Sequence, residues 1–258
     1  MNKEKAICII GGVGPMAGVG LHSEIIQQTK TDGTDQTHLD VIHLSCSELI
    51  EDRTEYLLSN EGENPAHGAL KVAQGAYLAA RELGKDMVIG VPCNTFHAPQ
   101  IFDKFLSLLK QKNIIVDVVH MLTETADYIA ASLPEVKNIG LMSTTGTRQV
   151  GVYKNIFEQR GITIIEVDEK EQSNLHETIY NKTKGIKAVS PVTSWAVDNF
   201  CKFANQLINK GAEAIILGCT EIPLALPEKT FKNIPLINPV HVLACSLIKA
   251  AAPEKLKP

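Results

Sequence analysis

The chain has 258 residues, 44% of them hydrophobic, which suffices for one large domain or for two lobes with buried cores. Its 25 basic and 29 acidic residues give a net charge of −4, which argues against nucleic acid or an anionic membrane as partner. The first apolar segment runs directly into glycines, and no apolar run has the length of a membrane span. We therefore expect a cytoplasmic protein whose six cysteines are free thiols.

The first half of the chain alternates strand-like and helix-like segments. A buried strand over 6–10 ends in a glycine turn, and Pro15 suits the first turn of a helix over about 15–30. Further strands are expected at 39–44, 86–90 and 114–119, and further helices at 66–83, 99–110 and 120–132. This alternation is typical of an α/β fold with a mainly parallel sheet.

The glycine turn suggests an anion site. Gly12-x-Gly14-x-x-Ala17 fits the loose dinucleotide pattern, but the second strand ends in Ser45-Cys46-Ser47, where a dinucleotide site carries an acidic residue. Backbone N–H groups at a helix N-terminus bind a carboxylate or phosphate. We therefore expect a small anion here rather than a nucleotide.

Arg53 follows the second strand in a predicted loop, where its guanidinium could bind a carboxylate in a fork. The alternative is a surface arginine paired with Asp52 or Glu55. In the second half, the lysine-rich segment 179–188 leaves a similar choice, because most lysines of such a run are solvated.

The second half repeats the layout of the first. Its segments are a strand at 138–142, a hydroxyl-rich turn at 143–147 opening a helix toward Gly161, a strand at 162–167, a charged segment at 168–177, a helix at 193–209, strands at 214–217 and 234–237, and a helix at 239–252. We predict two pseudo-symmetric α/β lobes, 1–118 with 234–258 and 119–233, with the active site in the cleft between them.

One cysteine in each lobe directly follows a buried strand. Cys93 and Cys219 lie where parallel α/β sheets bind ligands, outside the carboxyl ends of strands. We expect the pKa of both thiols to be lowered by the Asn and Thr groups that follow them and by helical N–H donors. Cys8, Cys201 and Cys245 are interpreted as structural, and Cys46 is left open because it also ends a strand.

Three chemistries can use such cysteines. A redox pair requires disulfide distance, and a cysteine nucleophile requires a base such as His97, His120 or His241. A two-base proton transfer requires one thiol and one thiolate on opposite faces of a substrate carbon. The mirrored motifs favour the third, with converging donors from the glycine turn, Asn94, Thr95 and Thr220 binding the carboxylate.

Five motifs in order resemble the aspartate/glutamate racemase family that does not use pyridoxal phosphate. They are Gly11-Gly12-Val13-Gly14-Pro15-Met16-Ala17, Asp52-Arg53-Thr54, Pro92-Cys93-Asn94-Thr95-x-His97, Ile186-Lys187-Ala188 and Gly218-Cys219-Thr220-Glu221. The resemblance covers the whole length. It implies two α/β lobes, commonly a homodimer, and Cys93 and Cys219 as base and acid, Cys219 deprotonating the L-enantiomer and Cys93 the D-enantiomer.

The Gly-Cys-Thr-Glu motif resembles the aspartate racemase branch, because glutamate racemases typically have histidine at the place of Glu221. In that branch the residues matching Arg53 and Lys187 bind the side-chain carboxylate, although Lys182 and Lys184 compete for the second match. The chain departs from the family at Phe96, where a small residue is usual, at Glu51, where proline is common, and at Asn238, where an acidic residue is common.

We therefore expect an amino-acid racemase that requires no cofactor or metal and acts on aspartate, with glutamate or a broader acidic set possible. The alternatives are a maleate isomerase or arylmalonate decarboxylase-like enzyme, and a non-catalytic binding protein for acidic amino acids. The residues expected to contact substrate are Gly12, Gly14, Met16, Arg53, Asn94, Thr95, Thr144, Thr145, Lys187, Thr220 and Glu221.

Overall fold

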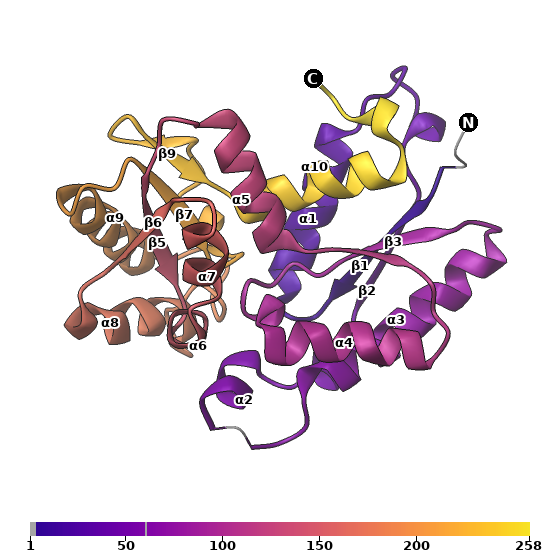
Figure 1. Cartoon of the computed structure of the whole chain (residues 1–258), viewed down its shortest axis with the longest axis horizontal. Helices are drawn as coiled ribbons and strands as arrows, with labels where there is room; N and C mark the ends of the chain where they lie inside the picture. The colour runs from indigo at the N-terminus through magenta and orange to yellow at the C-terminus, as the bar shows by residue number, and fades with distance from the viewer. Residues whose placement is uncertain (1–3, 60) are drawn as a thin grey trace. The chain divides into compact units, whose positions relative to one another are not determined.

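The computed structural model describes residues 4–59 and 61–258, and the chain divides into two compact units, Met1–Glu124 with Val240–Pro258, and Thr125–Pro239. Each unit contains a sheet dominated by parallel strands and flanked by helices (Figure 1). This confirms the α/β prediction with two sheets. Within the described ranges, no helix combines the length and the apolar character needed to cross a bilayer.

The first unit is built on a four-stranded parallel sheet in the order β2-β1-β3-β4. Its strands are β1 Ala6–Gly11, β2 Val41–Ser45, β3 Met87–Gly90 and β4 Asp117–Val119. Its helices are α1 Pro15–Gln28, α2 Arg53–Ser59, α3 Pro65–Glu82, α4 Pro99–Gln111 and α10 Pro239–Ala251. The C-terminal helix therefore completes this unit.

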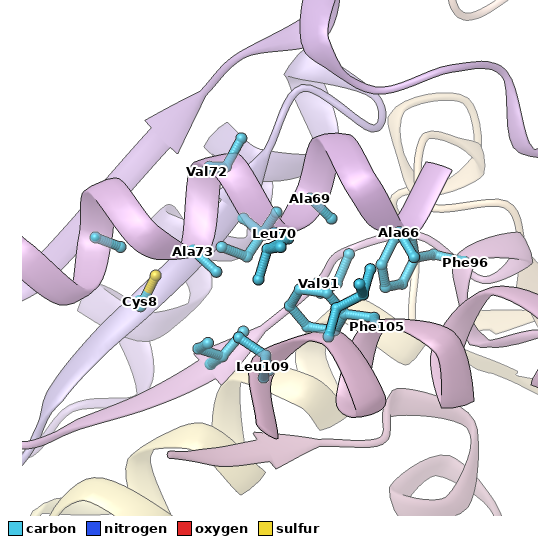
Figure 2. Packing of buried hydrophobic residues seen from close by; sticks show 14 of the residues in the cluster. Cys8, Ala66, Ala69, Leu70, Val72, Ala73, Val91, Phe96, Phe105 and Leu109 are labelled. Carbon is cyan, nitrogen blue, oxygen red and sulfur yellow. The ribbon is translucent and has the colours of Figure 1, made fainter. Parts of the chain in front are cut away.

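Alternation along β1 places its side chains in two layers of core. Ala6, Cys8 and Ile10 belong to the cluster that α3 and α4 cover, where Leu70 and Phe105 also pack (Figure 2). Burial raises the pKa of Cys8 to about 12, which fits the structural role predicted for this thiol.

The second unit repeats this strand order. Its sheet runs β6-β5-β7-β9-β8, and all but the last pair are parallel. The strands are β5 Asn138–Ser143, β6 Thr163–Glu166, β7 Ala214–Gly218, β8 Thr230–Phe231 and β9 Ile234–Ile237. The helices are α5 Met121–Ser132, α6 Thr145–Val150, α7 Val152–Glu158, α8 Glu169–Tyr180 and α9 Ser194–Asn209. In both sheets the second, first and third strands lie side by side in that order, so the internal repeat is confirmed. In the second sheet the fifth strand, β9, follows them, and the fourth strand, β8, lies at the edge.

Two predictions about the domain boundaries are corrected. We assigned 234–258 to the first lobe, but β9 pairs with β7, so its four residues belong to the second sheet. The first boundary falls after Glu124 rather than after residue 118. A short strand directly before a helix carries no sequence signal for the sheet that it joins.

Three predicted segments also differ locally. The helix expected toward Gly161 is broken into α6 and α7 at Gly151, whose φ of 65° is left-handed. The charged segment at 168–177 is helical, because Leu175 and Ile179 give α8 a buried stripe at helical spacing. Arg53 begins α2 instead of lying in a loop, and the Asp52 carboxylate caps this helix by accepting from the Glu55 N–H at 2.8 Å.

Gly68 allows α3 to lie directly on the 3₁₀ turn that follows β2. A Cβ at this position would lie 1.8 Å from the Leu49 carbonyl oxygen, and backbone cannot move aside as a side chain can. Gly68→Ala should therefore lower the free energy of unfolding by about 2–3 kcal/mol, measured by urea denaturation. Gly20→Ala in α1 is the control, because its Cβ would meet nothing within 4 Å and should stabilise the helix by about 0.5–1 kcal/mol. Equal stability of the two variants would contradict the close approach.

Candidate active site

In the first unit, Cys93 lies beyond the carboxyl end of β3. Gly90 at the end of this strand pairs with Ile9 of β1, so the chain leaves both strands at the same edge of the sheet. The glycine turn after β1 and the turn bearing Cys93 therefore belong to one edge. Cys93 is a free thiol and nearly buried.

The glycine turn is tightly packed. A Cβ on Gly12, whose φ is 88°, would lie 2.6 Å from the Ser47 nitrogen, so only glycine fits against the turn that follows β2. Gly14 has a φ of 152° and precedes α1, while Met16 in the first turn of that helix is 43% exposed.

Arg53 fixes this turn in place. Its side chain is buried, and it donates to the Val13 carbonyl oxygen at 2.8 Å and to the Glu51 carbonyl oxygen at 3.0 Å. The alternative was an exposed surface arginine, but this side chain is buried and two of its bonds go to backbone carbonyls. The guanidinium is thereby fixed beside the predicted anion turn.

Asn94 and Thr95 follow Cys93 and are buried, the second within a three-residue 3₁₀ turn, Thr95–His97. The His97 Nδ1 lies 2.9 Å from the Cys93 carbonyl oxygen, and burial, followed by the nearby His120, lowers the pKa of His97 to about 3. The His120 Nδ1 accepts from the Thr123 N–H at 3.2 Å. Both rings therefore hold backbone rather than a thiol.

In the second unit, Cys219 follows β7 and belongs to a buried network. Its Sγ donates to the Glu221 Oε2 at 3.2 Å, and the Thr220 hydroxyl donates to the same oxygen at 3.0 Å. The other oxygen of Glu221 lies 2.5 Å from the Lys187 ammonium. One carboxylate thus joins a thiol, a hydroxyl and an ammonium.

Burial and charge act against each other in this network. Burial alone would raise the pKa of Glu221, but the Lys187 ammonium and the hydrogen bonds from Cys219 and Thr220 reverse this and lower it. Burial alone would lower the pKa of Lys187, but the Glu221 carboxylate raises it. Both groups are therefore charged at neutral pH.

The same surroundings correct a prediction about Cys219. We expected helical N–H groups to lower the pKa of its thiol, but burial and the adjacent Glu221 carboxylate raise that pKa well above the ordinary value. The reason is local: Ile222–Leu224 is only a short 3₁₀ turn, which has no substantial dipole, and the nearest charge is negative. The structure thus describes Cys219 as a protonated thiol.

The structure distinguishes the three lysines of the segment 179–188. Lys182 and Lys184 are exposed, and the Lys184 ammonium lies 4.0 Å from the centre of the Trp195 ring. Lys187 is the member that reaches Glu221, and its ammonium also lies 5.6 Å from the centre of the Tyr180 ring. Lys187 therefore belongs to the Cys219 network.

Thr144 and Thr145 follow β5, whose last residue, Ser143, pairs with Gly218 of β7. This register brings the hydroxyl-rich turn to the sheet edge where Cys219 lies. The Thr144 hydroxyl caps α6 by accepting from the Thr147 N–H at 3.3 Å, and the Thr145 N–H donates to the His176 Nδ1 at 3.4 Å.

Sequence analysis overlooked Tyr153 of α7. This side chain is fully buried, and burial together with the nearby Cys219 raises the pKa of its phenol well above the ordinary value. Nothing in the sequence marked it as a neighbour of Cys219.

Residues 10–247 match the family described as Asp/Glu/hydantoin racemase. The chain belongs to this family. The match confirms the resemblance drawn from the five motifs and, at the level of the family, the expectation of an amino-acid racemase.

Solved structures of racemases share the fold. The aspartate racemase of Picrophilus torridus is 28% identical, with a TM-score of 0.76 over 96% of this chain and 94% of that one. An aspartate racemase homologue of Pyrococcus horikoshii is 22% identical, with a TM-score of 0.65 over 96% and 99% of the two chains. A glutamate racemase of Francisella tularensis, solved with D-glutamate, is 15% identical, with a TM-score of 0.62 over 99% and 84%. The last two likenesses are of fold alone.

A curated relative matches over a shorter length. An uncharacterised protein of Pectobacterium carotovorum is 31% identical over 96 residues, which are 35% of this chain and 57% of that protein. The match thus spans a little over half the length of the Pectobacterium protein.

Removing the Lys187 ammonium should show how much the unpaired, buried Glu221 carboxylate destabilises the fold. Lys187→Met leaves Glu221, which is 2% exposed, without its counter-charge and should lower the free energy of unfolding by about 3 kcal/mol at pH 7. In the wild type the lowered pKa of Glu221 contributes stability that is lost only as the pH falls through that low pKa. In the variant, unopposed burial raises this pKa, so the carboxyl takes up a proton earlier. The stability difference should therefore narrow between pH 7 and pH 4.

Lys184→Met is the matched control, because this lysine is exposed and lies over an aromatic ring rather than a buried carboxylate. Its stability should change by less than about 1 kcal/mol at either pH. Denaturant unfolding at both pH values measures the stability of the wild type and the two variants. A loss of stability in Lys187→Met that is the same at pH 7 and pH 4 would contradict the ion-pair argument.

Proposed function

We propose that the protein is a cofactor-independent amino-acid racemase in which Cys93 and Cys219 transfer protons at the α-carbon of an acidic amino acid. The observation that carries the proposal is the equivalent position of the two thiols. Each follows the third strand of its sheet, in both sheets the first strand lies between the second and the third, and each thiol is next to the turn that follows the first strand. Two-base catalysis needs such a pair, one thiol for each face of the substrate.

The Cys219 network supports an assignment of the two roles. Cys219 keeps its proton and donates a hydrogen bond to Glu221, so in this state it is the acid and Cys93 is the base. A thiolate at Cys93 removes the α-proton from one face, and Cys219 delivers its proton to the other. After delivery, the Lys187 ammonium stabilises the Cys219 thiolate, whose charge would otherwise lie next to the Glu221 carboxylate.

Family resemblance connects these roles with handedness. In the family, the cysteine matching Cys93 deprotonates the D-enantiomer and the one matching Cys219 the L-enantiomer. The described protonation state is therefore the one that accepts a D-amino acid. A cycle in the other direction begins with the proton on Cys93.

Aspartate is the proposed substrate. The solved structure named as an aspartate racemase is 28% identical to this chain, whereas the glutamate racemase solved with D-glutamate is 15% identical. The cations of the two half-sites, Arg53 and Lys187, are suited to the side-chain carboxylate. The glycine turn, Asn94, Thr95 and Thr220 supply donors for the α-carboxylate.

Incubation of the purified protein with L-aspartate in deuterated water should give D-aspartate with deuterium at the α-carbon, followed by NMR and chiral chromatography. Cys93→Ser and Cys219→Ser should each reduce racemisation by about a thousandfold or more, because a hydroxyl is a far weaker acid than a thiol at neutral pH. Cys201→Ser is the matched control and should keep wild-type turnover, since Cys201 lies in α9, away from the network.

The outcomes separate the proposal from its alternatives. Conversion of maleate, or loss of carbon dioxide from a malonate, without α-proton exchange in any amino acid would identify a different enzyme of the superfamily. Calorimetric binding of aspartate without deuterium uptake would identify a binding protein. Wild-type turnover in either cysteine variant would remove that thiol from the mechanism.

Arg53 tests the choice of substrate. Arg53→Ala should raise KM for aspartate by about a hundredfold, and much less for a neutral amino acid such as alanine, because only the acidic substrate loses a charge-assisted fork. The bonds from Arg53 to the Val13 and Glu51 carbonyls predict a general loss as well, which Arg53→Lys should reproduce only in part. Equal losses for aspartate and alanine would make Arg53 a residue that only holds the glycine turn.

A further inference from the structure

A second cluster of reactive groups lies in the first unit, on α1 and α10, away from the turns that carry the proposed racemase chemistry. Glu24 comes from α1, and His241 and Cys245 lie one turn apart on α10, which runs beside α1 in Figure 1. The His241 Nδ1 is 2.8 Å from the Glu24 Oε2, and the His241 Nε2 is 3.8 Å from the Cys245 Sγ. Thiol, imidazole and carboxylate thus form one chain of contacts.

This order of groups is the one that activates a nucleophile. A carboxylate on one ring nitrogen fixes the tautomer and orientation of the imidazole, and the other nitrogen takes the thiol proton. Because Glu24 and Cys245 contact opposite nitrogens, they do not converge on one point as metal ligands would. Hydrogen bonds to Cys245 and Glu24 raise the pKa of His241 to about 10, so the ring is an imidazolium at neutral pH.

Cys201 provides an internal comparison. It is a half-buried helical cysteine like Cys245, but burial and the neighbouring Asp198 and Glu228 raise the pKa of its thiol. Cys245 instead has a cation next to its sulfur. The 39% exposure of the His241 side chain allows a small molecule to approach the pair.

We propose that Cys245 is an oxidative modification site, a cysteine next to the His241–Glu24 pair that hydroperoxides convert to the sulfenic acid. The thiolate sulfur attacks the terminal oxygen of the hydroperoxide, so that an S–O bond forms and the O–O bond breaks. The sulfur is oxidised by two electrons, and the hydroperoxide is reduced to an alcohol, or to water when it is hydrogen peroxide. The imidazolium of His241 supplies the proton that the leaving oxygen takes up.

The test compares cysteines within the same folded protein. The full chain is treated with hydrogen peroxide at pH 7 in the presence of dimedone, which traps sulfenic acids, and peptide mass spectrometry follows labelling at each cysteine. Cys245 should be labelled about tenfold or more faster than Cys201, because an imidazolium next to the Cys245 sulfur favours the reactive thiolate, whereas carboxylates lie near Cys201. In denaturant the difference should disappear.

Two variants test whether fast labelling of Cys245 depends on His241 and Glu24 or only on the exposure of the sulfur. His241→Gln should reduce labelling of Cys245 to near the rate of Cys201, and Glu24→Gln, which keeps an acceptor oxygen, should reduce it less. An unchanged rate at Cys201 in both variants shows that the fold is intact. Labelling of Cys245 no faster than Cys201 in the wild type, or a His241→Gln rate equal to that of the wild type, would overturn the proposal.

Discussion

The parallel register between the first and third strands of each sheet is the constraint on which the proposed chemistry depends. Ile9 pairs with Gly90 in one unit, and Ser143 pairs with Gly218 in the other. Parallel strands end at a common edge, so each register places a cysteine-bearing turn beside a turn rich in glycine or threonine. Neither turn could provide this arrangement alone. The thiol acts on the α-carbon of a substrate, and nearby hydrogen-bond donors are needed to bind the carboxylate of that substrate. The repeated fold supplies both.

Within this repeat the two thiols have different surroundings. Asn94 and Thr95 follow Cys93, whereas Thr220 and Glu221 follow Cys219. The Glu221 carboxylate keeps a proton on Cys219, and Lys187 offsets its charge enough for the pair to remain ionised within the protein. A symmetric pair of thiolates would repel the carboxylates of an acidic substrate, and a symmetric pair of thiols would contain no base. The asymmetry between the two turns supplies one proton for the pair, which is what a two-base reaction requires.

The sequence was sufficient to predict most of the strands and the position of both cysteines, because buried apolar runs that end in glycine, proline or threonine carry strong local signals. It failed where the deciding interaction is distant in sequence. The partner of β9 depends on a sheet edge, not on Ile234–Ile237 themselves. The high pKa of Cys219 depends on burial and on the Glu221 carboxylate two residues away. The motif contains Glu221, but it does not reveal that this side chain points toward the thiol. Arg53 was expected in a loop, although Asp52 followed three residues later by Glu55 is a helix-start signature that the sequence analysis did not use.

Helix α10 shows how one element can stabilise a unit and also bear reactive groups. Leu247 of this helix packs against Gly90 at the end of β3, and a Cβ at Gly90 would lie 2.5 Å from the Leu247 Cδ1. The close packing therefore favours glycine directly before the segment that leads to Cys93. His241 and Cys245 lie on the same helix and meet Glu24 of α1. A polar group added at Cys245 would therefore lie next to His241, which links α10 to Glu24 of α1, and α1 begins immediately after the glycine turn. Oxidation of this thiol would act on the packing that positions the turn, without contact with either proposed catalytic cysteine.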